Sequence, residues 1–231
     1  MSWFVCGILP YVTAVVFVGG LVYALRRMAR TAATGIKFIV YPAAGSRSRL
    51  AADVAREVLL FPTIFATNKR FWALAWLFHL TLLVLFLGHL RVLTEPRWLW
   101  DALGISAEQA DLLGQQVGSV FGVTLLVTVI LLLLRRLAPN LLALSVAEDY
   151  LLLILILGLA LTGDAMRFGG SIDLEELRQY FRGLATFHPA PPANPMFTAH
   201  FFLAQLLLMY FPFSKLMHAF NVFWTLKFKR S

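Results

Sequence analysis

The stretch FWALAWLFHLTLLVLFLGHLRVL, residues 71–93, decides the fold class of this chain. It is long and apolar enough to cross a bilayer as a helix, which takes about 20 residues. It also contains two histidines, His79 and His89. Ionisable side chains are costly inside a membrane and usually serve a function there. The stretch therefore predicts a membrane-spanning helix that carries a functional site.

The composition of the whole chain is that of an integral membrane protein. Its 231 residues are 60% hydrophobic and only 14% charged, with a mean hydropathy of +0.77, whereas soluble domains are about 25% charged. We expect an all-α membrane bundle of five helices that forms one domain over residues 1–231. The expected spans are residues 3–25, 71–93, 117–134, 150–162 and 196–224. Asp149 and Asp164 closely bracket the fourth span.

Basic residues in the loops predict the orientation, because cytoplasmic loops carry an excess of lysine and arginine. The 26–70 loop has nine basic and two acidic residues, and residues 135–149 and the C-terminal tail add five more basic residues. The other two loops, with their helix borders, hold five basic and eight acidic residues. Five spans with the N-terminus outside and the C-terminus in the cytoplasm satisfy every loop. Residues 55–65 predict a short amphipathic helix that either lies on lipid or docks a cytoplasmic partner.

Cysteine content and charge exclude several classes of protein. The single cysteine, Cys6, leaves no internal disulfide framework and no cysteine-ligated iron–sulfur cluster in this chain. The net charge of +8 lies in the loops between spans, so it reports topology rather than a nucleic-acid surface. Residues 3–25 follow no basic segment and precede no clear cleavage site, so we expect an uncleaved anchor rather than a signal peptide.

The last predicted span, MFTAHFFLAQLLLMYFPFSKLMHAFNVFW, contains two more histidines, His200 and His218. Imidazole is a common ligand of haem iron, and pairing by depth predicts an outer haem between His89 and His200 and an inner haem between His79 and His218. On an ideal helix the fifth-span histidines lie ~27 Å apart on one face, but the second-span histidines lie only ~15 Å apart. We expect a kink at Pro212 and helix tilt to absorb part of this difference.

Other interpretations of these residues stay open. Each histidine could instead satisfy a local hydrogen bond in the bundle, and His188, in a loop, is either a surface residue or a proton carrier for quinone. Gly88, beside His89, permits close approach of a porphyrin or of another helix. Arg91 and Lys215 either pair with haem propionates or extend to the membrane surface.

At these residues the chain resembles the cytochrome b subunit of respiratory nitrate reductases, the NarI-like proteins. The shared motifs are GH at 88–89 with His79 ten residues earlier, P-x-W at 96–98, TFH at 186–188 and FPFSKLMH at 211–218. The resemblance implies five spans and two haems b whose axial ligands are His79, His89, His200 and His218. These relatives place a lysine that is important for quinol in the loop after the second span. Gln109 falls about there in this chain, so Arg91 or Arg97 would supply the cation.

Within that family, several segments are similar to the DsrM-type membrane subunit of the sulfite-reduction-associated Dsr complex. They are the long basic first loop, FPTIFATNKRFW at 61–72, GHLR at 88–91 and LTGDAMRF at 161–168. This resemblance implies a cytoplasmic iron–sulfur partner similar to the catalytic subunit of heterodisulfide reductase.

The resulting hypothesis is a di-haem cytochrome b of the bacterial cytoplasmic membrane that exchanges electrons between the quinone pool and an iron–sulfur subunit. The candidate quinone residues are Gly88, Arg91 and Arg97, and Lys215 is the candidate for a haem propionate. One alternative is the haem b subunit of a nitrate or heterodisulfide-type reductase, whose partner would be similar to a nitrate reductase beta subunit or to heterodisulfide reductase. The other alternative is a haem-free membrane anchor. A transporter fits poorly, because no inverted repeat is visible. No C-x-x-C-H motif occurs, which argues against covalent haem.

Overall fold

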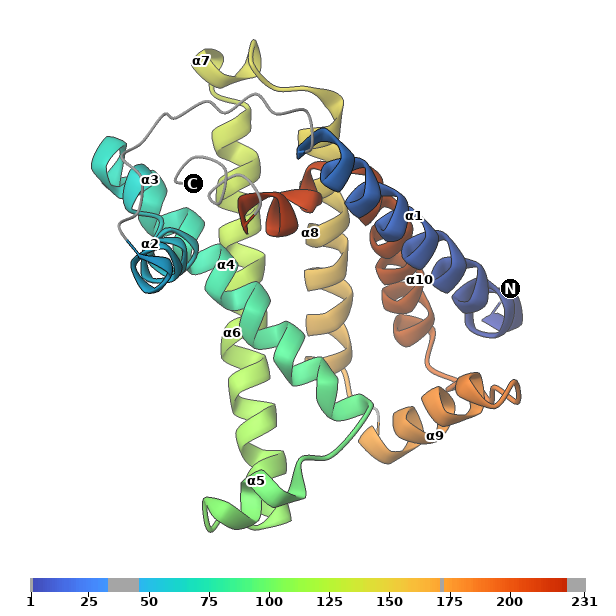
Figure 1. Cartoon of the computed structure of the whole chain (residues 1–231). Coiled ribbons are helices and arrows are strands. Elements are labelled where there is room, and N and C mark those ends of the chain that lie inside the picture. Colours follow the sequence, from blue (N-terminus) through green and yellow to red (C-terminus); the bar gives the residue numbers. More distant parts are fainter. Residues whose placement is uncertain (1, 33–45, 171–172, 224–231) are drawn as a thin grey trace. The chain divides into compact units, whose positions relative to one another are not determined.

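The computed structural model describes residues 2–32, 46–170 and 173–223. These residues form helices, turns and loops without any strand, and five of the helices are long and apolar enough to cross a membrane. The all-α, five-span prediction is therefore confirmed (Figure 1). The long helices are α1 (Leu9–Ala32, after a π-helical turn at Phe4–Ile8), α4 (Lys69–His89), α6 (Ala107–Arg136), α8 (Ala147–Phe168) and α10 (Pro195–Tyr210). The shorter ones are α2 (Arg47–Leu60), α3 (Pro62–Thr67), α5 (Arg97–Ala102), α7 (Pro139–Leu142) and α9 (Leu174–Ala185).

The chain divides into two compact units. The first comprises the residues up to Val12 together with Leu77–Leu207, and the second comprises Thr13–Trp76 together with the chain from Leu208 onward. The first unit therefore contains three of the four candidate histidines, and His218 belongs to the second.

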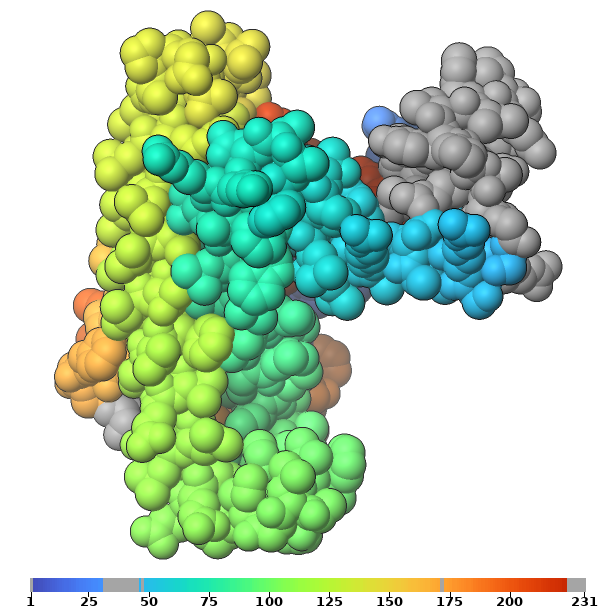
Figure 2. Space-filling model, turned by 90° about the vertical axis from the view of Figure 1, so that its left-hand side faces the viewer, coloured from blue at the N-terminus to red at the C-terminus, as the bar shows by residue number. Residues whose placement is uncertain are grey.

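Helices α6 and α8 run antiparallel, side by side, in the first unit (Figure 1). A buried core joins these two helices to Phe78 of α4 and consists, besides Phe78, of Leu125, Val129, Ile156 and Ala160. The face of α6 seen in Figure 2 is exposed, and the exposed residues of α6 include Val120, Val127 and Leu134. Apolar side chains on the outside of a helix suit contact with lipid tails.

Two of the long helices reach further than predicted. Helix α6 begins at Ala107 because Ser106 and Gln109 form a capping box, in which each side chain accepts a hydrogen bond from the other residue's backbone N–H. Helix α8 extends from Ala147 to Phe168, so Asp149 and Asp164 lie inside this helix rather than outside its ends. The expectation that the two aspartates bracket the span was wrong. Both are accommodated by neighbours on α6, Asp149 by Arg136 and Asp164 by Gly122, and the hydropathy pattern does not report such contacts.

Helix α9 closes one end of the first unit. Its buried Tyr180 packs with Val5, Cys6 and Phe197, and the Tyr180 hydroxyl donates a hydrogen bond of 2.7 Å to the carbonyl of Cys6. Gln205 ties α10 to the same N-terminal segment by donating to the carbonyl of Val5 at 3.0 Å. These contacts hold α9, α10 and the N-terminal residues together.

The second unit contains the amphipathic segment predicted at residues 55–65. The predicted segment is helical, but helix α2 begins earlier, at Arg47. The helix is interrupted at Phe61, which has a φ of 49° and is followed by Pro62, the first residue of α3. The indole groups of Trp72 and Trp76 donate to the carbonyls of Leu60 and Leu59. Two hydrogen bonds thus fix the end of α2 to the first turns of α4.

The last predicted span is also interrupted. Helix α10 ends at Tyr210 and is followed by a 3-10 turn at Phe211–Phe213, extended backbone at Ser214 and a second 3-10 turn at Lys215–Met217. Proline 212 cannot donate a backbone hydrogen bond, which prevents a continuous α-helix here. The prediction that His200 and His218 share one face of a single helix was therefore wrong.

Candidate functional site: a histidine pair between α4 and α10

The first predicted pair of histidines comes together within the first unit. His89 is the last residue of α4, and His200 lies in the second turn of α10. Their ring centroids are 6.1 Å apart and the ring planes differ by only 4°. Two imidazoles that coordinate one iron from opposite sides, each through a metal–nitrogen bond of about 2 Å, have centroids about 6 Å apart. The spacing of this pair therefore fits a shared metal ion.

The hydrogen bond that His89 makes leaves its Nε2 atom to coordinate a metal. Its Nδ1 lies 2.6 Å from the carbonyl oxygen of Leu85. A carbonyl can only accept, so Nδ1 carries the hydrogen and Nε2 keeps a lone pair. Metal-bound histidines are commonly oriented by such a hydrogen bond from the second ring nitrogen.

Helix α8 orients His200 in a similar way. The Nδ1 of His200 lies 3.0 Å from the Thr162 hydroxyl, and that hydroxyl lies 2.7 Å from the carbonyl of Gly158. The hydroxyl donates its one hydrogen to the carbonyl and so accepts from Nδ1, which leaves Nε2 of His200 free for a metal. A Cβ added at Gly163 would lie 3.3 Å from the His200 ring, so this glycine permits close packing of α8 against the ligand.

The donor set favours haem over a bare metal ion. Among the described residues, no group of three or more histidine, cysteine, aspartate or glutamate side chains is placed so that it could hold a metal ion. Structural zinc takes four protein ligands, whereas haem iron takes four from the porphyrin and needs only axial ligands from the protein. A pair of opposed imidazoles therefore fits haem.

The two histidines of the second predicted pair belong to different units, His79 to the first and His218 to the second. His79 lies within α4, half-buried, with its ring edge-on to Phe78 at 5.3 Å. His218 follows the interrupted end of the last span, where its Nδ1 donates to the carbonyl of Lys215 at 2.8 Å. The pairing of His79 with His218 stays a prediction, and so does a propionate contact by Lys215.

The candidate quinone residues differ in their surroundings. A Cβ added at Gly88 would meet no described atom within 4 Å, so the space beside His89 is open. Arg91, in contrast, is held by Glu95 at 3.0 Å and Asp111 at 2.7 Å. Arg97 lines a polar surface hollow of about 260 Å³ with Thr94, Glu95, Glu175, Arg178 and others. Gln109, which the resemblance placed near the position expected of a quinol-binding lysine, is used in the capping box of α6.

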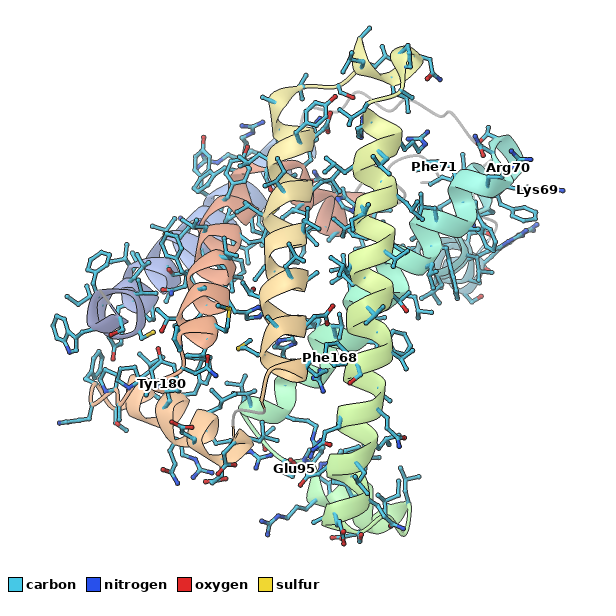
Figure 3. The ribbon with its side chains drawn as sticks, turned by 180° about the vertical axis from the view of Figure 1, so that it is seen from behind. Lys69, Arg70, Phe71, Glu95, Phe168 and Tyr180 are labelled. Carbon is cyan, nitrogen blue, oxygen red and sulfur yellow. The ribbon has the colours of Figure 1, made fainter. Side chains whose placement is uncertain are left out.

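A charged network follows His89 at the same end of the first unit. Glu95 accepts hydrogen bonds from Arg91, Arg178 and the indole of Trp100, and Figure 3 shows Glu95 toward the end where α8 finishes at Phe168. Burial opposes the charge of the Glu95 carboxylate. The hydrogen bonds from Arg91 and Trp100 and the two nearby guanidinium charges outweigh burial and lower the pKa of Glu95 below its usual value.

Sequence reasoning missed Thr162, Asp164 and Arg178 as neighbours of this site. A threonine in an apolar helix carries no signal until the tertiary contact is known. The charge of Asp164 was a signal, because ionisable residues inside spans are rare, but the predicted helix boundary placed it outside.

These features define a class of protein: a helical membrane protein of five potential spans that holds two histidine rings side by side between two helices. Residues 63–229 match the nitrate reductase gamma subunit family, and the chain belongs to that family. This membership agrees with the resemblance expected from the histidine motifs.

Three curated relatives extend the comparison. The "Hdr-like menaquinol oxidoreductase cytochrome b-like subunit" of Archaeoglobus fulgidus is 29% identical over 94% of this chain and 76% of its own length. The protein of the same description from Archaeoglobus profundus is 27% identical over 91% of this chain and 74% of its own length. The "Respiratory nitrate reductase 1 gamma chain" of Escherichia coli (strain K12) is 31% identical, over 63% of this chain and 69% of its own length.

Proposed function

We propose that this chain is a di-haem cytochrome b that exchanges electrons between a membrane quinone and a cytoplasmic iron–sulfur subunit. His89 and His200 would hold one haem, and His79 and His218 the other. When bound, haem supplies a one-electron redox centre. The protein supplies the axial imidazoles, their orientation and an apolar surround.

The observation that carries this proposal is the geometry of His89 and His200. Their rings are nearly parallel at 6.1 Å, and the Nδ1 of each ring is engaged by a separate acceptor. A histidine that only satisfied a local hydrogen bond would not need a second histidine at metal-bridging distance. The two acceptors, on α4 and α8, would keep both Nε2 atoms directed at a common ion.

The orientation deduced from the loops belongs to the proposal. With the N-terminus outside and the C-terminus in the cytoplasm of a bacterial cytoplasmic membrane, the His89–His200 pair lies near the outer surface. A quinone would then react beside Gly88, where the described structure leaves space. Because Arg91 is already bound to two carboxylates, Arg97 is the better candidate to contact the quinone oxygen, and Arg91 would position this loop.

The partner is proposed from the relatives. Both Archaeoglobus proteins are described as subunits of a menaquinol oxidoreductase, and they align with nearly the whole chain. The nitrate reductase gamma chain aligns with a smaller part. We therefore favour menaquinol as the quinone and a DsrM-type role in sulfur metabolism, with a heterodisulfide-reductase-like iron–sulfur subunit. The soluble subunit that co-purifies with the protein distinguishes this assignment from a nitrate reductase-like complex.

The deciding experiment is a reduced-minus-oxidised spectrum of the purified protein with a pyridine haemochrome count per chain. About two haems b per chain are expected if all four histidines are ligands. One haem would contradict the second pair. A colourless protein from cells supplied with haem would overturn the proposal and favour the membrane-anchor alternative.

A further inference from the structure

Asp164 is a half-buried acidic residue that has no role in the proposed electron transfer as described so far. It lies inside α8, next to Gly163, the residue that packs against His200. Its Oδ2 atom is buried and receives no hydrogen bond from the described residues. An ionisable group in a membrane-spanning helix is costly, and the cost is greater when it has no donor. Such a position indicates a functional role for the carboxyl group.

Three glycines on α6 make room for Asp164 and two other ionisable side chains. Gly114, Gly118 and Gly122 follow one another at intervals of four residues and so lie on one face. A Cβ at Gly122 would overlap Asp164, one at Gly118 would overlap Arg167, and one at Gly114 would overlap Arg91. The row covers about 12 Å of α6.

This row links Asp164 to the polar end of the first unit. Arg167 lies one turn from Asp164 on α8 and donates to the carbonyl of Gln115 at 3.2 Å. Arg91, at the far end of the row, joins the network of Glu95 and Asp111. Asp164 is thus the deepest member of a series of polar groups that begins at the surface and ends beside the histidine pair.

We propose that Asp164 is a redox-linked proton-binding site, whose carboxylate takes up one proton when the centre between His89 and His200 gains one electron. An O–H bond forms on the carboxyl group, and the proton comes from the polar network at the surface or from the quinol that supplies the electron. The proton is released when the electron leaves. One charge of each sign is added, so the local net charge is unchanged. The inference rests on the proposed haem between the two histidines.

The charged and titratable groups that face Asp164 support this coupling. Arg167 on α8 is a cation that favours the carboxylate while the centre is oxidised, whereas Arg91 at the end of the row is paired with Glu95 and Asp111. His89 and His200 would be neutral ligands, so the change in charge there comes from the electron alone. For two unit charges about 10 Å apart at an effective dielectric constant of 20, the added electron strengthens proton binding roughly tenfold.

A structural role for Asp164 predicts a different result. If the carboxylate only bound Arg167, directly or through water, its loss would lower the stability of the α6–α8 packing and leave the electron–proton coupling unaltered. The test must therefore measure coupling as well as folding.

The experiment compares the wild type with Asp164→Asn and Asp164→Glu by potentiometric titration of the haems between about pH 6 and 8 and by reduced-minus-oxidised infrared spectra. In the wild type, one haem potential should fall as pH rises, and a carboxylic acid band should appear on reduction. Asp164→Asn should lose most of that pH dependence and the band, and Asp164→Glu should restore part of both. Labelling the wild type with carboxyl-¹³C aspartate should shift the band, which keeps the test valid if the asparagine variant does not fold.

Asp149→Asn is the matched control. Asp149 is a buried aspartate at the other end of α8, but it pairs with Arg136 at 3.5 Å and accepts from the backbone N–H of Val146. Its substitution should leave the pH dependence and the band unaltered. Three results, obtained with a full haem content, would overturn this inference but not the proposed function. They are a wild type whose haem potentials do not depend on pH, a wild type without the aspartate band, and an Asp164→Asn variant that behaves as the wild type does. A wild type without haem overturns the proposed function first.

Discussion

The two predicted histidine pairs show how differently one sequence pattern can be realised. His89 and His200 lie within one compact unit, and each ring is oriented by its own hydrogen bond. His79 and His218 belong to different units, and His218 follows two 3-10 turns and extended backbone at Ser214. The first pair is therefore defined by tertiary contacts, whereas the second depends on the sequence motif.

The difference has a physical origin in the helices that carry the ligands. Helix α8 contacts the first pair through Thr162 and Gly163, so three helices contribute to that site. Helix α10 ends at Tyr210, and Pro212 removes the helical register that would have related His218 to His200. Spacing along a helix predicts a shared face only where the helix is continuous.

The largest expected effect comes from removing one axial ligand of each pair in turn. His200→Leu should reduce the haem content from about two to about one per chain and abolish haem reduction by quinol, because axial imidazoles hold the iron. His218→Leu should remove the other haem and leave reduction by quinol in place. Pyridine haemochrome counts and stopped-flow reduction measure the two effects.

The control for this comparison is His188→Leu. His188 is an exposed loop residue whose Nδ1 lies 2.7 Å from the carbonyl of Thr186, and its substitution should leave the haem content unaltered. If either ligand variant retained both haems, the pairing would be wrong. Loss of both haems from His218→Leu would mean that the two sites assemble together.

A smaller effect is expected from Thr162→Val, which removes the acceptor for Nδ1–H of His200 and keeps the side-chain shape. Partners of metal ligands contribute about 10–100-fold to metal affinity, so the haem of the first pair should dissociate about that much more readily. The haem of the second pair should be unaffected. Transfer of haem to an apoprotein acceptor, followed spectroscopically, measures this loss.

Thr128→Val provides the matched control. Thr128 is buried in α6 and donates only to the carbonyls of Thr124 and Leu125 in the contacts described, so valine should leave haem retention unaltered. Equal haem loss in both variants would show that Thr162 acts through general helix stability rather than through His200.

The sequence predicted much of this architecture, because apolar length and histidine placement are local signals. The five spans follow from runs of about 20 apolar residues, and the proximity of His89 and His200 follows from depth in the bilayer. The extension of α8 past Asp164 was missed, because Gly122 of α6, which accommodates this side chain, lies about 40 residues away in the sequence. The role of Thr162 was missed because it exists only after α8 packs beside α10.

The smallest expected effect concerns Glu95, which lies after the turn that follows His89. Its network of ion pairs should influence the haem site of the first pair only. Glu95→Gln leaves Arg91 and Arg178 without their shared carboxylate, and hydrogen bonds to a charged group contribute about 1.5–3 kcal/mol. The pKa of Glu95 is lowered in the folded protein. Its contribution to stability is therefore complete above the unfolded pKa of about 4.3 and is lost as the pH falls through the folded pKa.

The melting temperature of Glu95→Gln should consequently lie below that of the wild type at neutral pH, and the gap should narrow as the pH falls below about 4. Glu175→Gln is the control, because Glu175 contacts Arg178 at 3.4 Å and Arg182 at 3.5 Å but its side chain is 48% exposed. Exposed ion pairs contribute about 0–1 kcal/mol, so this variant should melt close to the wild type. A gap for Glu95→Gln that stayed constant with pH would mean that the carboxylate charge does not stabilise the loop. A change in the second haem would mean that the two histidine pairs are less independent than their surroundings indicate.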